Sequence, residues 1–189
     1  MMTNLCGDAE LQELMTALQS EGGDELQRAD RLVAEYPDDP RLHFLRGSIL
    51  AGIGRPIEAL PALRKAVELA PDFVIARFQL GFFELMSGEA EQALSTWGPL
   101  ALLPDGHYLR CFVAGLTYLI RDQFAESIAQ LREGIAANTE NPPLNRDMQM
   151  LIERTEELLG VGAADGGDEQ AASATSFLLD QFPGRGRAN

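Results

Sequence analysis

An interval of 34 residues recurs through the middle of the chain and restricts what it can fold into. Gly47 is followed at this spacing by Gly81 and then by Gly115. Other small and bulky residues keep the same step, namely Ala59, Ala93 and Ser127; Leu63, Trp97 and Leu131; and Gly54, Gly88 and Asp122. Several positions in step indicate a repeat protein, in which each unit packs on its neighbours.

The pattern within one interval resembles the tetratricopeptide repeat. In the first copy the matching residues are Gly47, Ala59, Leu63, Ala66 and Pro71, and a period of 34 residues is that of this family. The resemblance implies helix–turn–helix units. The sequence departs from the family pattern in two ways. A position that is usually aromatic is filled by His43, Arg77 and Cys111 in the three repeats. Helix-breaking residues lie inside the expected second helices, namely Pro61, Gly98 and Pro99.

Segments with the helical period flank these repeats. Apolar residues recur every three or four positions in residues 9–19 and 24–36, which we interpret as a degenerate first repeat. Residues 142–159 are apolar on one face only, as the end of a stack requires. We therefore predict an all-α, right-handed α-solenoid with the following parts: a degenerate helix pair in 1–40, three tetratricopeptide-like repeats in 41–141, a capping helix in 142–160, and a flexible linker with an apolar tail in 161–189.

The composition of the chain limits which partners and which cellular compartment are expected. The chain of 189 residues has a formal charge of -14, which disfavours nucleic acid, and Lys65 is its one lysine, which disfavours anionic membranes. Cys6 near an end expected to fray and Cys111 on an inward face do not form a disulfide framework. No signal peptide or membrane-spanning helix is expected either. These features favour a cytoplasmic protein.

A search for chemistry finds no catalytic arrangement. There is no glycine-rich phosphate loop and no nucleophile elbow. His107 and Cys111 stand four residues apart on an expected helix, but two ligands are too few for zinc. The simpler interpretation is a helix-starting histidine and a buried cysteine. We expect no enzyme activity, no catalytic residue, no metal and no cofactor.

The first helices of the repeats, by the same resemblance, line a concave groove that receives a segment of a partner. For any one residue the alternative is simple packing of helix against helix. Residues 78–86 and 112–120 are nevertheless apolar nearly all round, which indicates an apolar cover. The residues expected to line the groove are Phe44, Ser48, Ile75, Phe78, Phe82, Leu85, Met86, Leu109, Phe112, Leu116, Leu119 and Ile120.

The residues at the groove positions indicate which kind of ligand the groove can bind. A related sub-family holds acidic carboxy-terminal peptides with lysine, arginine and asparagine, but the matching slots here are Phe44, Ser48, Gln79, Leu109 and Val113. We expect instead a non-enzymatic adaptor or scaffold that binds an apolar peptide or helix of another protein. Two alternatives stay open: a small acidic chaperone of the secretion type for a hydrophobic client, and a self-associating structural protein.

The end of the sequence carries an apolar cluster after a linker of low hydrophobicity. The cluster consists of Phe177, Leu178, Leu179 and Phe182. Such a segment is unusual for a tail that stays in water. It could fill the groove of its own chain or of a neighbour, which would give a homo-oligomer. A disordered end, or a motif for a different protein, is the alternative.

Overall fold

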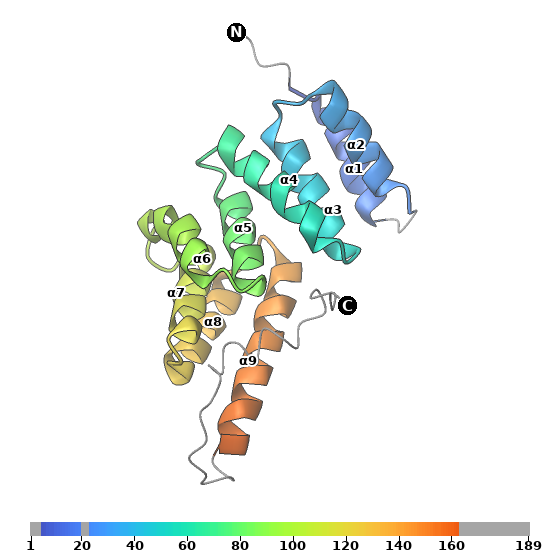
Figure 1. The fold of residues 1–189 in the computed structure, drawn as a ribbon. Coiled ribbons are helices and arrows are strands. Elements are labelled where there is room, and N and C mark those ends of the chain that lie inside the picture. Colours follow the sequence, from blue (N-terminus) through green and yellow to red (C-terminus); the bar gives the residue numbers. More distant parts are fainter. Residues whose placement is uncertain (1–4, 20–22, 163–189) are drawn as a thin grey trace. The chain divides into compact units, whose positions relative to one another are not determined.

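Helices form all the regular secondary structure in the described residues, 5–19 and 23–162 of this computed structural model (Figure 1). The all-α class expected from the sequence is confirmed. The chain divides into two units, residues 1–84 and 85–189, and the boundary falls inside α5 (Val74–Met86). Each unit is described by itself.

The first unit contains four helices and most of α5. Consecutive helices pack on one another, α1 on α2, α2 on α3 and α3 on α4. The start of α3 combines two helix-starting signals, because Asp39 accepts a hydrogen bond from the Arg41 N–H at 3.0 Å and Pro40 occupies the first helical position. The bounds are α1 Asp8–Gln19, α2 Glu25–Glu35, α3 Pro40–Gly52 and α4 Pro56–Leu69.

The helices of the first full repeat, α3 and α4, cross at a glycine. A Cβ placed on Gly47 would lie 2.8 Å from Cγ of Leu63, which is closer than carbon atoms approach without a shift. The sequence suggests that Ala59 presses on this glycine and that Leu63 packs between repeats. In the structure Leu63 itself covers Gly47, while the Ala59 carbonyl oxygen would be 3.4 Å from the added Cβ. Leu63 therefore closes the core within its own repeat.

The second unit has the same construction with one irregular helix. Its contacts run from α6 to α7, from α7 to α8 and from α8 to α9, and the short 3-10 helix η1 packs on both α6 and α7. At the crossing of α7 and α8, a Cβ on Gly115 would lie 2.7 Å from Cγ of Leu131. The bounds are α6 Ala90–Trp97, η1 Gly98–Leu102, α7 Tyr108–Ile120, α8 Phe124–Ala137 and α9 Pro142–Gly162.

The two interior prolines that depart from the repeat pattern have different outcomes. Pro61 lies inside α4 without ending it, and its side chain is exposed. At Gly98 and Pro99, by contrast, α6 stops and the chain tightens into η1. Pro99 has no N–H to donate to the carbonyl four residues earlier, and the glycine before it has low helix propensity. Two breakers in succession therefore shorten the second helix of this repeat.

The turns between paired helices use one backbone conformation at equivalent positions. Gly54, Gly88 and Asp122 have φ angles of 75°, 85° and 57°. This left-handed region costs a residue with a Cβ about 1–2 kcal/mol, whereas glycine adopts it freely. The alignment of these three residues in the sequence therefore reflects a requirement of the turn.

We expect Gly54→Ala to lower the free energy of unfolding by about 1–2 kcal/mol because alanine is strained at positive φ. Gly52→Ala is the matched control, since Gly52 ends α3 and has no atom within 4 Å of an added Cβ. This control should be neutral or stabilising by roughly 0.5 kcal/mol. Urea unfolding measures both, and equal effects of the two variants would contradict the assignment.

Candidate interaction surface

Two side-chain contacts join α3 to α5 and to Phe73, the residue before α5, within the first unit. The ring centroids of Phe44 and Phe73 lie 5.1 Å apart, with the ring planes tilted by 56°. One turn further along, the Ser48 hydroxyl lies 3.0 Å from Gln79 Oε1 and 3.0 Å from the Phe44 carbonyl oxygen, and it donates its single proton to one of them. An aromatic pair and a polar pair thus set these helices side by side.

A stripe along α5 extends this contact. Ile75, Gln79 and Phe82 follow one another at intervals of four and three residues, which places them on one side of a helix. All three are partly exposed, and the Phe82 ring stacks on the Phe78 ring with 6.2 Å between centroids. We use the name α3–α5 face for the following six partly exposed residues: Phe44, Ser48, Phe73, Ile75, Gln79 and Phe82.

The α3–α5 face carries no charge. Among the described residues, nothing hydrogen-bonds the side-chain nitrogen of Gln79, so this donor remains available. Basic groups near α3 are engaged elsewhere, Arg46 with Asp30 at 2.6 Å and His43 Nε2 with the Pro37 carbonyl oxygen at 2.7 Å. The face can therefore offer aromatic surface and one amide donor.

The twelve residues expected in the groove divide into two equal sets. The half-buried side chains are those of Phe44, Ser48, Ile75, Phe82, Met86 and Ile120. Side chains with at most 1% exposure belong to the packed interior and offer no surface, namely those of Phe78, Leu85, Leu109, Phe112, Leu116 and Leu119. Met86 and Ile120 belong to the second unit.

Phe112 shows why sequence position alone misplaces a buried residue. Its slot matches that of Phe44 and Phe78, so the sequence assigns it to the groove. In the structure its ring lies against Gly134 of α8, where an added Cβ would overlap the ring, and the Phe112 side chain is 0% exposed. The sequence signal that could have predicted this burial is Gly134, which stands where the first repeat has Ala66. The missing methyl group leaves space for the Phe112 ring.

Two residues of the α3–α5 face were not predicted as site residues. Phe73 precedes the first turn of α5 and therefore stands outside the helical pattern that identified the others. Gln79 entered the sequence argument only as a residue that fails to match a peptide clamp. The apolar tail residues lie outside the described part of the chain, namely Phe177, Leu178, Leu179 and Phe182.

The candidate metal pair of the sequence has structural roles. The Nδ1 atom of His107 accepts a hydrogen bond from the Leu109 N–H at 3.2 Å and caps α7. Cys111 is 5% exposed, and burial raises the pKa of its thiol. Within residues 5–19 and 23–162, no three His, Cys, Asp or Glu side chains gather as a metal site would require. None of the helices in these ranges is long and apolar enough to cross a membrane.

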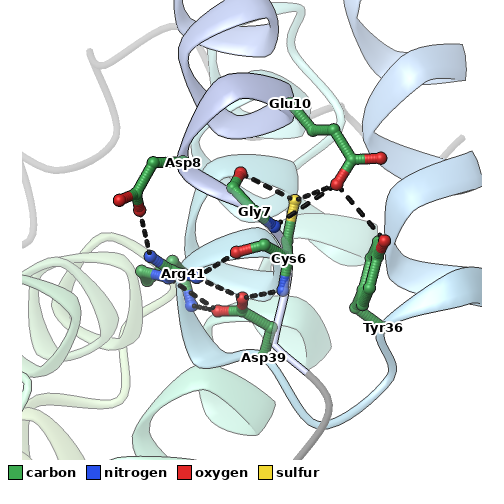
Figure 2. A network of polar contacts seen from close by, with 7 residues as sticks. All are labelled: Cys6, Gly7, Asp8, Glu10, Tyr36, Asp39 and Arg41. Carbon is green, nitrogen blue, oxygen red and sulfur yellow. Dashed lines mark hydrogen bonds and ion pairs between the residues drawn. The ribbon is translucent and has the colours of Figure 1, made fainter.

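A buried carboxylate fixes the segment that precedes α1 (Figure 2). Asp39 is 0% exposed and accepts hydrogen bonds from the Cys6 N–H at 3.0 Å and from Arg41 Nη2 at 2.7 Å. Arg41 Nη2 also donates to the Cys6 carbonyl oxygen at 2.8 Å. We call Cys6, Asp39 and Arg41 the N-terminal clasp. The sequence suggested that Cys6 frays, but its side chain is only 3% exposed.

The pKa values of Asp39, Cys6 and the neighbouring Tyr36 are shifted. Burial alone would raise the pKa of Asp39, but hydrogen bonds from Arg41 and Cys6 outweigh this effect and hold the pKa below its usual value. Burial and the adjacent Glu10 carboxylate raise the pKa of the Cys6 thiol. Burial, Glu10 and Glu35 likewise raise the pKa of Tyr36 to about 12. At neutral pH the clasp thus combines an ionised carboxylate with a protonated thiol.

Comparison with known proteins identifies the fold. No family model matches the sequence, and no curated protein matches it either. A MamA chain from Desulfovibrio magneticus RS-1, residue 41 to its end, matches with a TM-score of 0.56 and 15% identity over 85% of this chain and 99% of that one. The MamA RS-1 ArsTM double mutant matches with a TM-score of 0.56 and 14% identity over 81% and 97%. Both are tetratricopeptide-type helical solenoids, and the fold class predicted from the sequence is confirmed.

We expect Phe112→Ala to lower the free energy of unfolding by about 3–5 kcal/mol, as for other buried phenylalanines. Phe44→Ala removes a partly exposed ring and should cost about 1 kcal/mol. Chemical denaturation of the two variants distinguishes interior from surface. A small loss of unfolding free energy in Phe112→Ala would contradict the buried position and favour the groove position that the sequence suggested.

We expect Asp39→Asn to destabilise the protein at pH 7 by about 2 kcal/mol, because hydrogen bonds to a charged acceptor are lost. The pKa of Asp39 is lowered in the folded state, so its contribution is present above the usual value near 4 and disappears as pH falls through the folded pKa. Asp30→Asn, at a half-exposed ion pair, is the control and should change stability by less than about 1 kcal/mol. A pH series of urea unfolding curves should show the two variants converging in acid.

Proposed function

We propose that this chain is a non-enzymatic protein-interaction module, an adaptor or scaffold, whose α3–α5 face holds an extended apolar segment of another protein. The observation that carries the proposal is the combination of partly exposed aromatic rings with the available amide donor of Gln79. The likeness of fold to tetratricopeptide-type solenoids agrees with an interaction role.

The aromatic rings supply the energy of the proposed contact. Phe44, Phe73 and Phe82 are large apolar groups that already make ring contacts and so lose little freedom on binding. Each square ångström of apolar surface that a partner covers contributes about 25 cal/mol. A segment with two or three apolar side chains at the right spacing would therefore bind chiefly through these rings.

Gln79 favours an extended segment over a helix. A carbonyl oxygen can accept two hydrogen bonds, but the side-chain nitrogen of Gln79 gains most from a backbone carbonyl group that has no other partner. Carbonyl groups inside a helix are already paired, whereas those of an extended peptide are free. The neutral face also offers no counter-charge for an acidic peptide.

The tail segment 177–182 is the competing occupant. Its composition matches the chemistry of the face, and tethering raises its effective concentration to about the millimolar range. Occupation of a neighbour's face by this segment would make the protein self-associate. The cytoplasmic location expected from composition belongs to the same proposal, since it determines which partners are available.

The test uses 12-residue peptides selected by display against the full-length chain and then labelled for fluorescence anisotropy. Phe44→Ala and Gln79→Ala should each weaken the selected peptides about tenfold, which corresponds to roughly 1.4 kcal/mol. Ile57→Ala is the matched control, because Ile57 is an apolar side chain of the same unit that is 88% exposed and outside the face. The Ile57→Ala variant should bind the selected peptides with the affinity of wild type.

The proposed site is wrong if peptides bind Phe44→Ala, Gln79→Ala and wild type equally well. Deletion of residues 176–189 decides the role of the tail within the same assay. Higher affinity after deletion would show competition by the tail, and unchanged affinity and oligomeric state would exclude it from the α3–α5 face.

A further inference from the structure

The end of the first unit contains a second apolar surface, which α1 covers. Ala29 of α2 and Leu42 of α3 are both 0% exposed, and Ile49 is 7% exposed. Partly buried Leu32 and Leu45 pack around them. We call these five residues the end face. These residues belong to α2 and α3, so another helix with the side chains of α1 could occupy the surface that they form.

The fit of α1 defines what such a helix must look like. Leu11, Leu14 and Leu18 pack on the end face and stand three and four residues apart, and Leu14 is only 1% exposed. Met15 points elsewhere and is 43% exposed. The ligand of the end face is therefore an amphipathic helix with one apolar stripe.

The rim of the end face adds a requirement for charge. α1 has acidic side chains and no basic ones. Asp8 lies 3.7 Å from Arg41 across the rim, and Glu13 faces Arg28 and Arg31 in the cleft between α1 and α2. A rim of three arginines in a chain of charge -14 favours an occupant that carries carboxylates.

The attachment of α1 is uneven along its length. Its start is held by the N-terminal clasp and by Glu10, which accepts hydrogen bonds from the Tyr36 hydroxyl at 3.2 Å and the Gly7 N–H at 3.3 Å (Figure 2). Its middle borders a cleft of about 290 Å³ between α1 and α2. In that cleft, neither Glu13 nor Arg31 makes a hydrogen bond or ion pair with any described residue. Opposite charges there face one another without pairing.

We propose that α1 is an exchangeable occupant of the end face, and that an acidic amphipathic helix of another protein binds there in its place. A helix as short as α1 is only marginally stable in water, so α1 loses its structure when it leaves the face. A longer or better paired helix avoids that cost. This site is separate from the α3–α5 face and does not depend on the function proposed for it.

The probe is a labelled synthetic peptide with the sequence of residues 5–19 and a serine in place of Cys6, added to the full-length chain. Leu14→Ala in the chain weakens its own α1 but leaves the end face intact, so the peptide should bind this variant at least about tenfold more tightly than wild type. Met15→Ala is the matched control on the neighbouring exposed position and should bind like wild type.

The reaction rates of the two cysteine thiols show which part of the chain becomes exposed in a variant. Cys6 lies in the same apolar cluster as Leu14 of α1 and Cys111 lies in the second unit, at 3% and 5% exposure. In Leu14→Ala a thiol reagent should modify Cys6 faster and leave Cys111 protected. If both thiols react, the variant has unfolded as a whole, and Leu11→Ala, which truncates a partly buried residue, replaces it.

Two results would overturn the proposal. One is a variant with Cys6 exposed and Cys111 protected that does not bind the peptide. The other is equal binding of a peptide in which lysine replaces Asp8, Glu10 and Glu13, because the arginine rim would then have no role. The proposal predicts a loss of at least about tenfold for this charge-reversed peptide.

Discussion

The close crossing of paired helices at a glycine is the constraint on which the first and third repeats depend. At Gly47 and Gly115 the second helix presses a leucine, Leu63 or Leu131, against the backbone of the first. A methyl group at either glycine would have to displace a fully buried side chain. The low helix propensity of glycine, about 1 kcal/mol below alanine, is the smaller cost. This contact therefore sets how closely α3 approaches α4 and α7 approaches α8.

The repeat period predicted the helices, the pairing of α3 with α4 and of α7 with α8, and the turns, because each depends on contacts that recur with the sequence. It did not predict which side of a first helix is buried. Phe44 and Phe112 occupy equivalent slots, yet one is partly exposed and the other covers Gly134 of α8. The difference comes from a residue on another helix, and a pattern along one helix does not contain it. The Ser48–Gln79 contact, 31 residues apart, was missed for the same reason.

The net charge of the chain conceals an uneven distribution of acidic and basic side chains. The chain has an excess of carboxylates, and Arg28 and Arg41 already pair with Asp24 and Asp39, but three arginines of α2 and α3 still form a local basic region. Arg28, Arg31 and Arg41 meet the acidic side of α1, while the α3–α5 face is neutral. The two proposed surfaces therefore select different ligands, one by charge and helical form, the other by aromatic contact and free backbone groups.

Asp39 has two roles that connect parts of the chain distant in sequence. The same carboxylate caps the first turn of α3 and binds the backbone of Cys6, 33 residues earlier. The Arg41 N–H and guanidinium, which belong to that turn, orient its two oxygens. A change that disturbs the start of α3 therefore also disturbs the segment that precedes α1, although no backbone hydrogen bond of α3 reaches the described part of that segment.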